Sequence, residues 1–67
     1  NNARIQYRLA GLYYKTDRIR NAIRSFKKAL MMDPDQYQEF FKICPEAKKS
    51  KEIKKMLKNQ IIYKESL

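Results

Sequence analysis

The residues with the clearest capacity for chemistry are arginines and tyrosines near the start of the chain. Arg4 and Arg8 are four positions apart, which places them one turn apart on one face of a helix. Two guanidinium groups in that arrangement can converge on one anion, and carboxylates favour such charge-assisted donors. Tyr7, Gly11 and Tyr14 lie on the same face. The pattern indicates either an anion-binding surface or a solvated basic stripe whose tyrosines pack on a neighbouring helix.

Residue types that catalysis requires are scarce. The chain has no histidine, and Cys44 is its only cysteine, so no intrachain disulfide and no histidine-based nucleophile pair can form. The seven carboxylates are scattered without metal-ligand spacing. A buried free cysteine behaves as a small hydrophobic residue, which we favour over a reactive thiol. We therefore predict no enzymatic activity, no cofactor and no metal.

Positive charge dominates the composition. Sixteen Lys and Arg against seven Asp and Glu give a net charge of +9, which speeds encounter with anionic partners; a solvated basic surface explains the same numbers. At 67 residues the chain is one small unit that buries little apolar area. No apolar run reaches the ~18 residues of a membrane span. The sequence does not identify the cellular compartment, and the cytoplasm is weakly favoured.

The few helix breakers divide the chain into four expected helices. Glycine occurs once and proline twice, and apolar residues between the breaks recur at helical spacing. Asn2, Asp33 and Ser50 are candidate N-caps, and Pro34 suits a first helical turn. Short connections predict antiparallel packing of successive helices. The expected all-α elements are about 3–15, about 18–32, a short helix from about 34 to 43, and about 51–64.

An internal repeat joins the two halves. With an offset of 34 residues, Arg8 falls on Lys42 and Leu9 on Ile43, and size and polarity agree at most such pairs until the match decays near the C-terminus. A period near 34 in a helical chain indicates stacked helix pairs.

The segment Ala22 to Pro34 reads A-I-x-x-F-x-x-A-L-x-x-D-P. Together with Leu9, Ala10 and Tyr13, it resembles the tetratricopeptide repeat family. The resemblance implies a solenoid of antiparallel helix pairs, with residues 1–34 as one repeat and 35–67 as a degenerate, C-terminal capping repeat. Similarity of the first two residues to a linker between repeats suggests further repeats upstream. The implied core residues are Leu9, Ala10, Tyr13, Ala22, Ile23, Phe26, Ala29, Leu30 and Pro34.

In this family the first helix of each pair lines a concave groove, so the resemblance implies that the arginine face points inward. Arg4 and Arg8 match positions where peptide-binding repeats hold a C-terminal carboxylate, and Lys42 repeats Arg8 one period later. The implied function is a scaffold that binds a peptide or protein, either acidic or with a free carboxylate. The implied peptide-binding residues are Arg4, Tyr7, Arg8, Gly11, Tyr14 and Lys42.

Two alternatives stay open, and one further expectation concerns self-association. The basic residues of the second and last helices suit RNA or an acidic surface, although base stacking would need interleaved aromatic residues. A purely structural end cap is the other alternative. We also expect weak self-association through Ile5 and Leu12, because arrays of this kind usually need about three repeats to bury their core.

Overall fold

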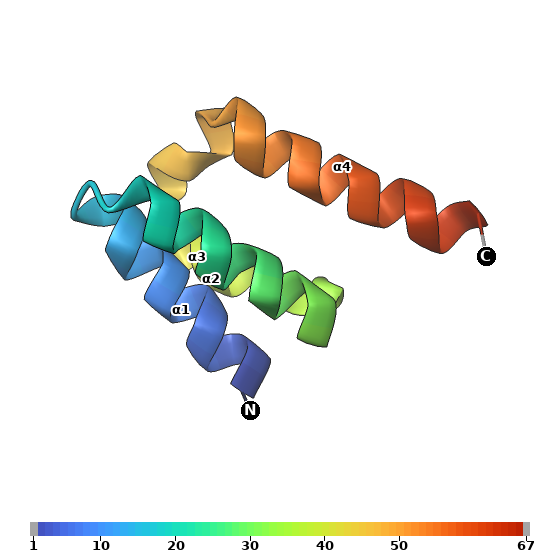
Figure 1. The fold of residues 1–67 in the computed structure, drawn as a ribbon, viewed down its shortest axis with the longest axis horizontal. Helices are drawn as coiled ribbons and strands as arrows, with labels where there is room; N and C mark the ends of the chain where they lie inside the picture. The colour runs from blue at the N-terminus through green and yellow to red at the C-terminus, as the bar shows by residue number, and fades with distance from the viewer. Residues whose placement is uncertain (1, 67) are drawn as a thin grey trace.

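A helical hairpin organises the fold. The computed structural model describes the backbone of residues 2–66 and the side chains of residues 2–59. Two long helices run antiparallel, a short third helix lies against the first, and the fourth extends beyond the others toward the C-terminus (Figure 1). The elements are α1 (Asn2–Lys15), α2 (Ile19–Met32), the 3₁₀ turn η1 (Pro34–Gln36), α3 (Gln38–Ile43), the 3₁₀ turn η2 (Pro45–Lys49) and α4 (Lys51–Ser66).

Side-chain capping begins two of the helical elements, η1 and α4, at the residues that the sequence predicts. The Asp33 carboxylate accepts a hydrogen bond from the Asp35 backbone N–H at 3.1 Å and caps η1. The Ser50 hydroxyl accepts one from the Ile53 N–H at 3.3 Å and caps α4. Two expectations were wrong in detail. Asn2 is the first residue of α1 rather than its cap, and the third helix is divided at Tyr37 into η1 and α3.

A cluster of aromatic rings forms the centre of the core. Phe26 of α2 lies between Tyr7 of α1 and Phe40 of α3, with ring centroids 5.6 Å and 4.6 Å away respectively. All three side chains are fully buried. Ala22 and Ala29 are also fully buried, and their small side chains let the paired helices approach closely. One residue, Phe26, therefore joins three helices.

The predicted core divides into two groups. Ala10, Ala22, Phe26, Ala29 and Leu30 are buried, which fits the expectation. The remaining members are half-buried, and these are Leu9, Tyr13, Ile23 and Pro34. Cys44 is fully buried like Ala10, its partner in the internal repeat.

The last helix packs through its first turns. Ile53 is fully buried, and Met56 and Leu57 are half-buried against the same core. α4 runs in the same general direction as α2 (Figure 1), as alternate members of an antiparallel series do. Gln60 and Lys64 fall one 34-residue period after Phe26 and Leu30, and both lie outside the described side chains. The division into a repeat, 1–34, and a cap, 35–67, stays a prediction.

Candidate binding surface on α1 and α3

Three cations from two helices gather around one carboxylate. Arg4 Nε lies 3.6 Å from Glu39 Oε1, and Arg8 Nε lies 3.5 Å from Glu39 Oε2. Lys42 Nζ donates a hydrogen bond to Glu39 Oε1 at 3.2 Å. The helical spacing of Arg4 and Arg8 on α1, and of Glu39 and Lys42 on α3, brings all four to the junction of the two helices.

Glu39 is the least exposed member of this cluster. Its side chain is 15% exposed, whereas those of Arg4 and Arg8 are about half exposed (50% and 51%). The hydrogen bond from Lys42, followed by the charges of the cations, lowers the pKa of Glu39 below the ordinary carboxyl range. Three cations thus meet one carboxylate in this cluster. The cluster can therefore attract a second carboxylate.

Tyr7 and Gly11 face neighbouring helices rather than solvent. Tyr7 donates a hydrogen bond from its hydroxyl to the Asp33 backbone carbonyl at 2.7 Å. Burial, and then the charges of Asp33 and Asp35, raise the pKa of Tyr7 well above its ordinary value. Gly11 is buried, and a methyl group at its Cβ position would lie 2.6 Å from Ile43 Cβ. A ligand cannot reach Tyr7 or Gly11 in this arrangement, because both are buried between helices.

Tyr14 occupies an intermediate position. Its ring packs edge-on against Phe40 with centroids 6.1 Å apart, and its side chain is half-buried. Of the six candidate binding residues, the structure therefore brings Arg4, Arg8 and Lys42 together and leaves Tyr14 partly accessible beside the hairpin. The other two, Tyr7 and Gly11, are buried in the packing between helices.

Glu39 is the residue that sequence reasoning missed. It lies three positions before Lys42, a spacing that joins side chains on a helix. This spacing indicates a contact between Glu39 and Lys42 within one helix. It does not indicate that two arginines approach Glu39 from another helix.

The first half of the chain matches a known repeat family. The tetratricopeptide repeat family matches residues 3–36, just over half of the 67 residues. The chain belongs to the tetratricopeptide repeat family. No curated protein and no solved structure matches it significantly. The matched tetratricopeptide repeat covers α1, α2 and η1, and repeats of this family generally mediate protein–protein interactions.

The tetratricopeptide repeat departs from its usual pattern in ways that the structure explains. Asp17, where the family usually has glycine, adopts a left-handed backbone with φ of 65°, which aspartate tolerates better than most residues. Gln6, where a large aromatic residue is usual, is half-buried. Phe40, its counterpart one period later, is fully buried in the core.

A second basic surface accompanies the repeat. Exposed cations occupy the outer side of α2 and the turn before it, and they are Arg18, Arg20, Arg24, Lys27 and Lys28. The nearest aromatic residue, Phe26, is fully buried and cannot stack on a base. Tyr63 of α4 lies outside the described side chains. The described part of this surface therefore offers charge without a stacking platform.

Within residues 2–66 no helix has the length and apolar character to cross a bilayer. The described residues contain no cluster of three or more potential metal ligands.

The Cys44 thiol donates a hydrogen bond to Glu46 Oε2 at 3.4 Å. Burial, and then this hydrogen bond, raise the pKa of Cys44, which disfavours the nucleophilic thiolate.

Proposed function

We propose that the chain is a protein-interaction module that binds an acidic peptide segment through Arg4, Arg8 and Lys42. The convergence of these cations on Glu39 carries the proposal, because it brings three donors from two helices around a carboxylate. An incoming carboxylate has the same chemistry as Glu39 and meets the same three cations. In the arrangement expected for a repeat array, α1 and α3 are first helices of successive pairs and line one concave face.

The partner that suits this surface is a peptide with an acidic side chain or a free C-terminal carboxylate. Arg4 and Arg8 are half exposed, so a ligand can reach them without displacing packed side chains. Charge-assisted contacts to arginine are stronger than neutral hydrogen bonds. Glu39 competes for the same cations, so the geometry favours ligands with more than one carboxylate.

A pair of charge-matched variants tests the proposal. One variant carries Arg4→Gln and Arg8→Gln, and the control carries Arg20→Gln and Arg24→Gln; each loses two positive charges. Binding of a labelled acidic peptide is measured by fluorescence anisotropy at moderate salt, with free and amidated C-termini. We expect the first variant to bind about three- to tenfold more weakly and the control to bind almost as well as the parent. Melting curves show whether either variant loses the fold.

Equal losses in the two variants would refute the proposed surface. That result would favour the alternative of a general anion-binding module for RNA or an acidic surface, which the exposed cations of α2 support. No binding of any acidic peptide, with an intact fold, would favour a purely structural end cap.

A further inference from the structure

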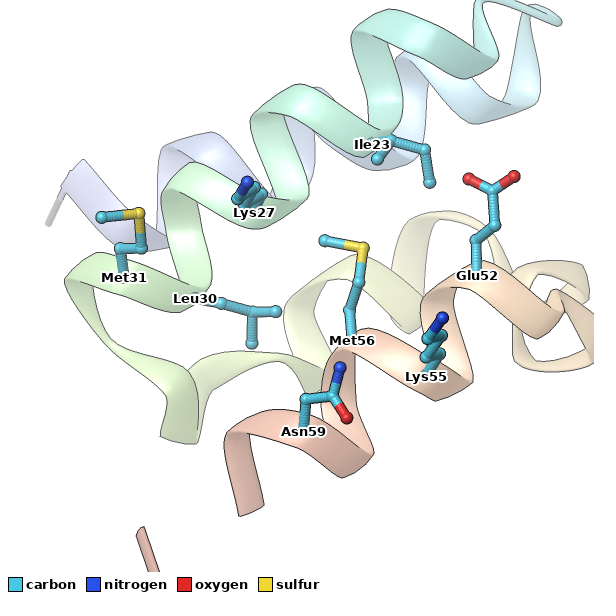
Figure 2. Close-up of a pocket in the computed structure, with 8 residues that line it drawn as sticks. All are labelled: Ile23, Lys27, Leu30, Met31, Glu52, Lys55, Met56 and Asn59. Atoms are coloured by element: carbon cyan, nitrogen blue, oxygen red, sulfur yellow. The ribbon is translucent and has the colours of Figure 1, made fainter. Parts of the chain in front are cut away.

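An open groove separates α2 from α4, on different helices from the arginine surface. Figure 2 shows Ile23 and Leu30 of α2 pointing across it toward Met56 of α4. Its volume is about 460 Å³. α2 contributes side chains at positions 23, 27, 30 and 31, and α4 contributes those at 52, 55, 56 and 59. Each helix therefore presents one face about two turns long, or ~12 Å.

The floor of the groove is apolar and partly exposed. Leu30 is 4% exposed and joins the core, while Ile23 and Met56 are half-buried. Met31 is 76% exposed at one end of the groove. Methionine adapts its unbranched side chain to irregular partners. The floor thus offers a continuous apolar strip along the described part of the two helices.

The flanks of the groove are positively charged. Lys27 and Lys55 line its two sides, and Glu52 is the one acidic residue among the described residues of the lining. In α2 no residue is acidic, and beyond the lining both helices carry further exposed lysines, including Lys28 and Lys54. Within the described residues, neither Lys27 nor Lys55 forms an ion pair. An occupant that matches the groove therefore combines an apolar strip with acidic edges.

We propose that this groove docks an amphipathic, acid-flanked helix of a partner protein. A helix with apolar residues at every third or fourth position presents a strip that fits a two-turn apolar floor, and acidic residues on both sides of that strip meet Lys27 and Lys55. The long helices α1 and α2 of a second copy fit poorly, because they carry no acidic residue and would bring positive charge against positive flanks.

Methionine methyl groups report occupancy of the groove directly. The probe is a helical peptide of about 15 residues, enough for a marginally stable helix, with leucines in one strip and glutamates beside it. Both ends are blocked, so the probe has no free carboxylate for Arg4 and Arg8. When the chain carries ¹³C-labelled methionine methyl groups, we expect the NMR signals of Met31 and Met56 to shift as the peptide is added. Met32 is 45% exposed but does not line the groove, so its signal is the internal control.

Matched variants separate the groove from general charge. We expect Lys27→Gln with Lys55→Gln to weaken peptide binding by at least about threefold at low salt, and Lys28→Gln with Lys54→Gln to change it far less. Met31→Gln should weaken binding by about tenfold, and Met32→Gln should not. Arg4→Gln with Arg8→Gln should leave binding of the helical peptide unchanged. Failure of the groove proposal is therefore distinguishable from failure of the proposed function.

Several outcomes would overturn the inference. These are equal losses in the two lysine pairs, equal affinity for a scrambled peptide of the same composition, and a shift at Met32 as large as those at Met31 and Met56. Vesicles of anionic phospholipid or a short RNA that shift the same two methyl signals more strongly than the peptide would assign the groove to a different partner.

Discussion

Replacing Gly11 with alanine tests how closely α1 and α3 approach. The added Cβ would lie 2.6 Å from Ile43 Cβ and 2.7 Å from Ile43 Cγ2, whereas carbon atoms pack best at about 3.5–4.0 Å. The two helices must therefore separate by about 1 Å. Ile43 cannot relieve the contact by a change of rotamer, because its Cβ is fixed to the backbone of α3.

Two effects of opposite sign set the stability of this variant. Alanine is favoured over glycine in a helix by about 1 kcal/mol, and overpacking of this kind costs about 1–3 kcal/mol. We expect a net loss of about 1 kcal/mol, or a melting temperature lower by about 4–8 °C for a chain of this size. Separation of α1 and α3 also lengthens the contacts of Arg4 and Arg8 with Glu39, now 3.6 Å and 3.5 Å.

Thermal melting by circular dichroism measures the effect. Asn21→Ala is the control, because it raises helix propensity at an exposed position of α2 without meeting another helix. We expect the control to melt at or above the temperature of the parent. If Gly11→Ala also melts at or above the parent temperature, the close approach of α1 and α3 is refuted.

Three further predictions concern stability and association. Phe26→Ala, which removes a fully buried ring 4.6 Å from Phe40, should cost about 3–5 kcal/mol; a melting curve within a degree or two of the parent would contradict it. Glu39→Gln should make the melting temperature less sensitive to acid. Because folding lowers the pKa of Glu39, its ionised form stabilises the fold at neutral pH, and this contribution disappears as pH falls through the lowered pKa. The variant should thus melt below the parent at neutral pH and approach it in acid, and a constant difference across the titration would count against the cluster. Ile5 and Leu12, 58% and 52% exposed, should mediate weak self-association that sedimentation detects as a concentration-dependent mass; a strict monomer would exclude it.

Much of the fold was predictable because its signals are local. The stripe that contains Phe26 and the small Ala22 and Ala29 identified the buried side of α2. Asp33 and Ser50 cap the following elements through hydrogen bonds to N–H groups two and three residues away, which short-range spacing reveals. The division of the third helix at Tyr37 was missed because a proline in a first turn suits both a 3₁₀ turn and an α-helix.

The candidate site was predictable only in part. The sequence alone determined that Arg4 and Arg8 share a face with Tyr7 and Gly11, because helical periodicity depends on position along one chain. Only the tertiary structure decided what meets that face. Packing of α2 and α3 against α1 buries Tyr7 and Gly11 and brings Glu39 between the arginines, since contacts between helices depend on angles and distances that periodicity does not encode.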